Sequence, residues 1–239
     1  MGVYADDLLA TATSDALLDA FGEAVQSLEL KCLGSVENFL GVRVGYDDLN
    51  GYTIDQEQMI TELLHKNRLE KANAVRIPVG DETFIDSESA DAQVLPTRGA
   101  GTVKRPTTKS FQSLIGSLLW IARCSRPDIL FAVHRATQRI HAPCDYDIKL
   151  ALHILRYLAR AIGMKLHMGG VSISSSVQLT GFTDSDYAAN KTTRMSISGA
   201  VLLVDTMPIW WQVKQQSAVA LSTAEANFVS AVVGAKVLL

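Results

Sequence analysis

Three successive segments between residues 107 and 162 constrain the fold of this chain more than any other feature, because their apolar residues recur every three or four positions. That spacing places apolar side chains on one face of a helix. We therefore expect three helices that pack through these faces, with Pro127 in the first turn of the second helix and Pro143 ending it. The apolar stripes are Phe111, Leu114, Ile115, Leu118, Leu119 and Ala122, then Ile129, Leu130, Val133 and Ile140, then Ile148, Ala151, Leu152, Leu155, Leu158, Ala159 and Ile162.

The segment before residue 80 predicts a mixture of strands and helices. Ser14 can cap a first helix whose apolar stripe we expect to be buried. Residues 39–44 and 52–54 predict strands that pair across a turn. Asp55 and Gln58 then resemble a capping box that opens a second, short helix. The stripe of the first helix consists of Leu17, Leu18, Phe21, Val25 and Leu28.

The last part of the chain, from residue 165, predicts strands followed by a helix. Residues 177–183, 199–204 and 207–211 predict three strands, and residues 217–221 extend this β portion. Helical spacing then takes over after Glu225, through Ala226, Val229, Val233 and Val237. A mixed first segment, a helical middle segment and a last segment of strands followed by a helix together predict the fold class α+β.

Composition narrows the class of protein. The chain is 48% hydrophobic and 20% charged, which is typical of a soluble globular protein. It contains no apolar run of the roughly 18 residues that suggest a membrane span, and no signal peptide. Cys32, Cys124 and Cys144 are far apart and lack metal-binding spacing, so we expect buried free thiols and an intracellular location, cytoplasmic or nuclear.

Charge is distributed unevenly along the chain. Residues 1–97 carry 6 Lys/Arg and 18 Asp/Glu, whereas residues 98–165 carry 12 Lys/Arg and 3 Asp/Glu. A strongly basic segment is a candidate surface for contacting a phosphate backbone. Arg156 and Arg160 are four residues apart and therefore share one helix face. Charge alone is equally compatible with basic side chains that lie on the solvated outer faces of the helices and bind nothing.

Carboxylates occur at two places where strands are expected to end. Asp6 and Asp7 lie between two short apolar runs, which predicts a strand, a tight turn and a second strand. Asp184 and Asp186 end another predicted strand. Carboxylate oxygens are ligands that Mg²⁺ prefers, but a solvated turn is the commoner role for such acids. Glu225 near a helix start can also simply interact with the helix dipole.

Several segments, taken in order along nearly the whole chain, resemble segments of the copia-type LTR retrotransposon polyproteins. The matching segments are Tyr4-Ala5-Asp6-Asp7, Leu33-Gly34, Phe39-Leu40-Gly41-Val42, Ser113-Leu114-Ile115-Gly116-Ser117-Leu118-Leu119-Trp120, Ser125-Arg126-Pro127-Asp128-Ile129, Ile154-Leu155-Arg156-Tyr157-Leu158, Phe182-Thr183-Asp184-Ser185-Asp186-Tyr187-Ala188, Ser196 to Gly199, Trp210, Lys214-Gln215, and Ala220-Leu221-Ser222 with Glu225-Ala226. The first three resemble a reverse transcriptase, and the segments from Phe182 onward resemble its ribonuclease H.

This resemblance implies roles for particular residues. It implies that Asp6 and Asp7 are paired polymerase carboxylates that hold Mg²⁺, with Mn²⁺ as a substitute, at the primer end. Asp184 and Glu225 match two carboxylates of the ribonuclease H metal cluster, and Asp186 matches it more weakly. The nucleic-acid contacts that we expect are Gly41 in a primer-grip-like segment, where the alternative is a simple turn or bulge, and Arg156, Arg160 and, more weakly, Lys214.

The resemblance also implies how the chain is divided. It implies the end of a polymerase palm in residues 1–80, a linker or long loop in 81–106, a thumb- or connection-like helical region in 107–164 and a truncated ribonuclease H-like domain in 165–239. The parent activity would be RNA-directed DNA synthesis with degradation of the RNA strand, on an RNA template, a DNA primer, an RNA–DNA hybrid and dNTPs, without a membrane.

Each predicted metal site is incomplete in this chain, since the remaining acidic segments of both enzymes are not found and Asn227 stands where the family usually has Glu. We therefore expect this chain to be inactive alone. The alternative is a non-catalytic nucleic-acid-binding remnant. The sequence leaves the oligomeric state open.

Overall fold

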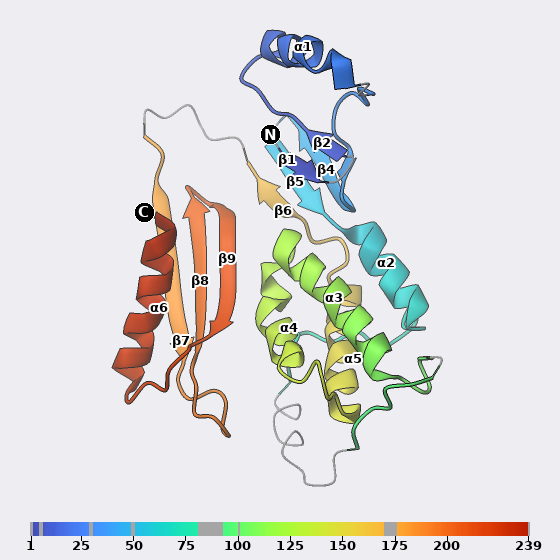
Figure 1. The fold of residues 1–239 in the computed structure, drawn as a ribbon, viewed down its shortest axis with the longest axis vertical. Coiled ribbons are helices and arrows are strands. Elements are labelled where there is room, and N and C mark those ends of the chain that lie inside the picture. Colours follow the sequence, from blue (N-terminus) through green and yellow to red (C-terminus); the bar gives the residue numbers. More distant parts are fainter. Residues whose placement is uncertain are drawn as a thin grey trace.

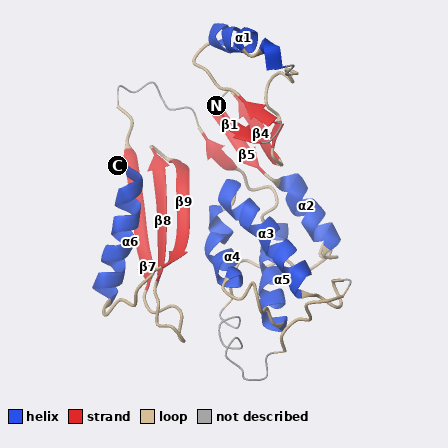
Figure 2. Cartoon of the chain, in the orientation of Figure 1, coloured by secondary structure: helices blue, strands red, loops and turns tan. Residues whose placement is uncertain are grey.

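The computed structural model describes residues 2–4, 7–28, 31–48, 51–80, 93–99, 101–169 and 176–238, and these residues adopt an α+β fold in which all the strand pairs are antiparallel. Strands and helices are segregated into three parts (Figure 1, Figure 2). A β-rich part contains the N-terminus, a helical part lies in the middle, and a three-stranded sheet with one helix contains the C-terminus.

The helical part holds the main core, as the apolar stripes predict. It consists of α3 (Thr108–Cys124), the 3-10 helix η4 (Pro127–Ile129), α4 (Leu130–Thr137) and α5 (Asp145–Arg160). Pro127 lies in the first turn of η4, where its missing N–H costs nothing. The core is completed by α2 (Glu57–Lys66), which packs against α5. The side chains fully buried in this core include Ile60, Phe111, Ile115, Leu118, Ile129, Val133, Ile154 and Leu155.

Both long helices of this part begin with a capping box. In α3, the side chain of Thr107 accepts a hydrogen bond from the Ser110 N–H, and the Ser110 hydroxyl accepts one from the Thr107 N–H. In α5, Asp147 accepts hydrogen bonds from the backbone N–H and the thiol of Cys144. These contacts satisfy N–H groups that a helix N-terminus otherwise leaves unpaired.

The N-terminal part contains two sheets. Strands β1 (Gly2–Tyr4) and β2 (Asp7–Leu9) pair as a hairpin, as predicted. The second sheet has the order β3-β4-β5-β6, from β3 (Asn38–Phe39), β4 (Val42–Asp47), β5 (Gly51–Asp55) and β6 (Leu166–Met168). Residues 166–168, which fall in the predicted ribonuclease H-like segment, thus pair with the N-terminal part.

The single strand predicted over residues 39–44 is wrong. The chain reverses at Leu40 and Gly41, whose φ angles are 54° and 76°, so that β3 and β4 form a tight hairpin. Two consecutive positive φ angles are typical of the two-residue turn that matches the twist of a hairpin. Glycine adopts this conformation easily, but leucine does so rarely, and local preference therefore offers little sign of the turn.

The buried stripe predicted for the first helix is also wrong. Helix α1 (Asp15–Ala24) forms as expected after Ser14, yet it has no buried residue, and Leu17 remains 55% exposed. Its principal contact is with the adjoining 3-10 helix η1 (Gln26–Leu28). Figure 1 shows α1 standing apart from the helical part. Spacing identified a helix with an apolar face but could not reveal which surface covers that face.

The C-terminal part is a sheet of three strands, β7 (Leu179–Asp186), β8 (Ile197–Val204) and β9 (Met207–Gln215), followed by α6 (Thr223–Leu238). The predicted continuation of the β portion over residues 217–221 is wrong, since these residues form no strand. Strand β9 packs against α4, and the indole of Trp211 donates to the carbonyl oxygen of Ala122 at 2.8 Å. This contact joins the sheet to the helical part.

Helix α6 approaches β7 and β8 through small residues. Ala226 and Ser230 are fully buried, and the Ser230 hydroxyl donates to the carbonyl oxygens of Asp184 and Gly199 at 2.6 and 3.2 Å. A Cβ atom at Gly234 would overlap the methyl group of Thr183. Position 234 therefore requires glycine for the close approach of the helix to the sheet.

The three cysteines are free, but they differ in burial. Cys144 is buried and Cys124 half-buried, whereas Cys32 is exposed, so the expectation of buried thiols is wrong for Cys32. Partial burial raises the pKa of Cys124, and the nearby Arg123 opposes this shift.

Within the described part of the chain, no helix is long and apolar enough to cross a membrane.

We predict that Gly234→Ala destabilises the protein by about 1–3 kcal/mol, the usual cost of inserting a methyl group into a tight contact. Gly116→Ala is the matched control, because Gly116 also lies in a helix but a Cβ there meets nothing within 4 Å. The control should be stabilising by about 0.5–1 kcal/mol through its helix propensity. Urea unfolding followed by circular dichroism measures both effects. Equal effects of the two substitutions would contradict the close approach.

We also predict that His134 makes stability depend on pH. Its Nε2 atom is buried and has no hydrogen-bond partner among the described residues, and burial, followed by the charge of Arg135, lowers the pKa of this imidazole below 6.5. The folded state therefore favours neutral His134. The stability that His134 contributes is fully present above about pH 6.5, and it is lost as the pH falls through the lowered pKa of the folded state. Acid should destabilise the wild type more than His134→Leu in unfolding measurements between about pH 7 and 5. Identical pH profiles would refute the assignment.

Candidate functional site

The polymerase-like carboxylates lie on the N-terminal hairpin. Tyr4 pairs with Asp7 across β1 and β2, and Asp7 is exposed at the start of β2. Asp6 lies outside the described residues. The hairpin that the sequence predicted is present, but the geometry of the paired carboxylates is not described, so their role in binding Mg²⁺ or Mn²⁺ stays a prediction.

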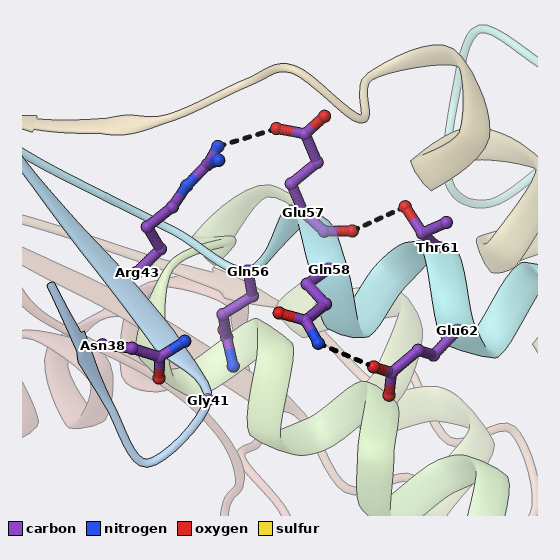
Figure 3. A pocket seen from close by; sticks show the side chains of 8 residues that line it. All are labelled: Asn38, Gly41, Arg43, Gln56, Glu57, Gln58, Thr61 and Glu62. Atoms are coloured by element: carbon purple, nitrogen blue, oxygen red, sulfur yellow. Dashed lines mark hydrogen bonds and ion pairs between the residues drawn. The ribbon is translucent and has the colours of Figure 1, made fainter.

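A pocket of about 320 Å³ lies between the β3–β4 hairpin and the start of α2 (Figure 3). Gly41 forms part of its wall, at the turn that the sequence left as one of two possibilities for this residue. Polar side chains supply most of the remaining surface. The lining residues are Asn38, Gly41, Arg43, Gln56, Glu57, Gln58, Thr61 and Glu62.

Arg43 binds two carboxylates beside this pocket. Its Nε donates to both carboxylate oxygens of Asp55 at 3.1 Å, and its Nη2 donates to Glu57 at 2.7 Å. Hydrogen bonds from Arg43 to Asp55, then to Glu57, raise the pKa of the guanidinium. The positive charge of Arg43 is thus compensated, and the pocket does not offer a net cationic surface to phosphate.

The predicted capping box of α2 is absent because its residues have other partners. Asp55 accepts the Glu57 N–H at 3.2 Å and binds Arg43, while the amide of Gln58 donates to Glu62 at 3.0 Å. The Arg43–Asp55 pair follows from register, since these residues are directly opposite on β4 and β5. Sequence reasoning missed it, although opposite charges on adjacent strands were a usable signal.

The family-like segment around Arg126 has a structural role. Arg126 is only 2% exposed and makes a two-pronged ion pair with Asp128, with N–O distances of 3.0 and 2.8 Å. Its Nη1 donates to the carbonyl oxygen of Ala161 at 2.9 Å, and its guanidinium lies 5.7 Å from the ring centre of Tyr157. Partial burial opposes ionisation of Asp128, but bonds from Arg126 and Tyr157 outweigh it and lower the pKa of this carboxyl. Arg126 is therefore unavailable to nucleic acid.

The two arginines predicted to bind nucleic acid differ in their surroundings. The Nε of Arg156 donates to the carbonyl oxygen of Asn73 at 2.6 Å, and its own carbonyl oxygen accepts the Val75 N–H at 3.5 Å. His153 on the same helix contacts the carbonyl oxygen of Ile77 at 3.0 Å. Arg156 thus holds residues 73–77 against α5, whereas Arg160 is exposed.

The acids of β7 lie on the face of the strand opposite to α6. Ser185 reaches α6 through a bond of 2.6 Å to Asn227, and Thr183 contacts the helix at Gly234. Because side chains alternate along a strand, Asp184 and Asp186 point to the other side of the sheet. Burial lowers the pKa of Arg135 on α4, and the charges of Tyr146 and then Asp186 oppose this shift.

Glu225 is engaged in capping its own helix. Its carboxylate accepts the Leu221 N–H at 2.7 Å, and its backbone N–H donates to the hydroxyl of Ser222 at 3.1 Å. In this first part of α6, the side chain of Asn227 accepts a hydrogen bond from Ser185 of β7. Lys214, the weaker nucleic-acid candidate, is exposed near the end of β9.

Among the described residues, no group of three or more His, Cys, Asp or Glu side chains is arranged to hold a metal ion. Asp184 and Glu225 lie on elements that pack together, but the carboxylate of Glu225 accepts the Leu221 N–H. The described part of the chain therefore does not present a preformed magnesium site, and the metal-binding roles of Asp184, Asp186 and Glu225 stay predictions.

The chain is similar to known proteins along almost its entire length. It is 29% identical over 231 residues to a retrovirus-related Pol polyprotein from transposon TNT 1-94 of Nicotiana tabacum, covering 96% of this chain and 17% of that protein. It is 28% identical over 229 residues to the corresponding polyprotein from transposon RE1 of Arabidopsis thaliana, covering 95% and 14%.

A much shorter relative covers the same region. The chain is 28% identical over 232 residues to an uncharacterized mitochondrial protein of Arabidopsis thaliana, and the match covers 95% of this chain and 87% of that protein. No protein-family model matches the sequence, and no solved structure matches it. The chain thus spans less than a fifth of the length of the two transposon polyproteins that it matches.

Proposed function

We propose that this chain, which is similar over almost its entire length to retrovirus-related Pol polyproteins of transposons, corresponds to the end of the reverse transcriptase and the beginning of the ribonuclease H, and that alone it catalyses neither reaction. The parent protein would act on an RNA template, a DNA primer, an RNA–DNA hybrid and dNTPs within the cell. The order of elements supports this assignment: a hairpin carrying Asp7, a helical part, and three antiparallel strands carrying Asp184 followed by a helix.

The observation that carries the proposed inactivity is the local hydrogen bond that engages Glu225. Two-metal phosphoryl transfer requires several carboxylates around one pair of ions. Among the described residues, no group of three or more His, Cys, Asp or Glu side chains could hold a metal ion, and the carboxylate of Glu225 already accepts the Leu221 N–H. A carboxylate held in this way must give up that bond before it can turn toward a metal.

We predict that purified residues 1–239 show neither primer extension on an RNA template nor hydrolysis of RNA in a hybrid, with Mg²⁺ or Mn²⁺. Asp7→Asn is the control for primer extension, and Asp184→Asn is the control for RNA hydrolysis. Both side chains are exposed, so their replacement should leave the fold intact. Incorporation that Asp7→Asn abolishes, or hydrolysis that Asp184→Asn abolishes, would refute the proposal.

A second candidate function is nucleic-acid binding without catalysis. It is favoured by the exposure of Lys149 and Arg160, which lie three helical turns apart on one face of α5 within the basic segment. These two side chains can contact phosphate groups without disturbing the hydrogen bond of Arg156, which holds residues 73–77 in place.

We predict that Lys149→Ala with Arg160→Ala weakens binding to an RNA–DNA hybrid. The slope of log affinity against log salt should become shallower by about 1 for each phosphate group that is no longer bound. Lys191→Ala is a matched control, because Lys191 is an exposed lysine outside the basic segment. Fluorescence anisotropy over a salt series measures these slopes. Absence of binding at low salt, or equal effects of Lys191→Ala, would exclude this function.

A further inference from the structure

The outward face of α6 is apolar and exposed. Phe228 is 70% exposed and Val232 is 37% exposed, and their spacing of four residues places them on one face. Ala224, Ala231 and Ala235 continue the same face, and we call these five residues the α6 stripe. Figure 1 shows the sheet on one side of α6, and the helix packs chiefly against β7 and β8. A helix that is apolar on all sides is normally buried on all sides.

The charges of α6 indicate what can cover this stripe. The helix carries only one acidic and one basic residue, Glu225 in its first turn and Lys236 in its last turn. They are 11 residues apart in the sequence, which is close to three helical turns, so both lie on the same flank of the stripe. An antiparallel copy of the helix would place Lys236 of one molecule on the same side of the interface as Glu225 of the other, where their side chains can approach each other.

The shapes of the side chains favour the same arrangement. In an antiparallel pair that crosses between Ala231 and Val232, the large Phe228 of each copy lies opposite the small Ala235 of the other. Large residues opposite small ones allow two helices to interdigitate closely. The size pattern is thus self-complementary about a two-fold axis between positions 231 and 232, as an interface between identical subunits requires. The charge pattern is centred one residue away, between positions 230 and 231, an offset of about 1.5 Å along the helix.

We propose that the α6 stripe is the interface of a homodimer in which two α6 helices pack antiparallel about a two-fold axis. Phe228 is the central apolar contact of each subunit. Glu225 keeps its bond to the Leu221 N–H and uses its remaining oxygen to face Lys236 of the second copy. The interface uses the outer face of α6 and leaves its contact with β7 and β8 unchanged.

Sedimentation equilibrium of the full chain over about 1–200 μM tests this proposal. We expect a concentration-dependent dimer, and Phe228→Glu should weaken it by about 30-fold, the effect of a strong interface residue. Leu17→Glu is the matched control, since Leu17 is an equally apolar residue, 55% exposed on α1. Circular dichroism should show that both variants remain folded. A monomer at all concentrations, or a dimer that Phe228→Glu leaves unchanged, would overturn the proposal.

A charge exchange tests the antiparallel pairing. Lys236→Glu should weaken the dimer by about twofold to fivefold, the range of an exposed ion pair. Adding Glu225→Lys to this variant should restore the affinity, because the two charges are then exchanged together. A role of either residue in the stability of its own helix would not produce this recovery, so failure of the double variant to regain affinity would exclude the antiparallel arrangement.

Disulfide formation tests the position of the axis. In a Cys32→Ser background, which removes the exposed native thiol, Ala231→Cys should form an intermolecular disulfide because the two copies of position 231 meet at the crossing. Ala224→Cys should not, since its two copies would be about 22 Å apart along the helix axis at about 1.5 Å per residue. Equal cross-linking at both positions would contradict the proposed geometry.

Discussion

Donors that satisfy the C-terminal carbonyls of α3 and α5 hold the three parts of this protein together. The last four carbonyl groups of a helix have no partner within it, and leaving them unpaired in a buried place is costly. Trp211 of β9 donates to Ala122 near the end of α3, and Arg126 donates to Ala161 at the end of α5. Ser125, the residue between these contacts, donates to Gln56 at the start of α2 at 2.8 Å. One short region therefore connects the N-terminal sheet, the helical core and the C-terminal sheet.

The same region explains why the basic charge of residues 98–165 is a poor measure of nucleic-acid binding. Arg126 is buried because its charge is neutralised by Asp128 and its donors are used by the fold. Removing one partner of such a pair leaves a buried charge without compensation, which costs about 3–5 kcal/mol. Arg156 is likewise committed to a backbone carbonyl. Of the basic side chains of α5, the exposed Lys149 and Arg160 are better placed to contact a phosphate backbone.

The sequence predicts the elements of this fold better than their partners. The stripes of α3, α4 and α5 were recognisable because helical spacing is local, and their burial follows once three such stripes are adjacent. The pairing of β5 with β6 joins residues that are far apart in the chain, such as Ile54 and Leu166, and the left-handed Leu40 contradicts local preference. The order of the motifs also identified the candidate site residues. It did not reveal their geometry, because Glu225 caps its own helix and Asp55 pairs with Arg43 on the adjacent strand.

Helix α6 shows why an apolar pattern alone can indicate the wrong buried face. Spacing suggested a stripe from Ala226 through Val229, Val233 and Val237, but burial is deepest at Ala226 and Ser230, with glycine at 234 where the helix meets Thr183. Small residues let the helix axis come close to the sheet, and hydrogen bonds from Ser230 to two strand carbonyls then fix its distance. Close approach on this side leaves the largest apolar side chain, Phe228, on the other. The exposed stripe is thus a consequence of how α6 meets its sheet, and its self-complementary charges make a second copy of the helix the partner of matching chemistry.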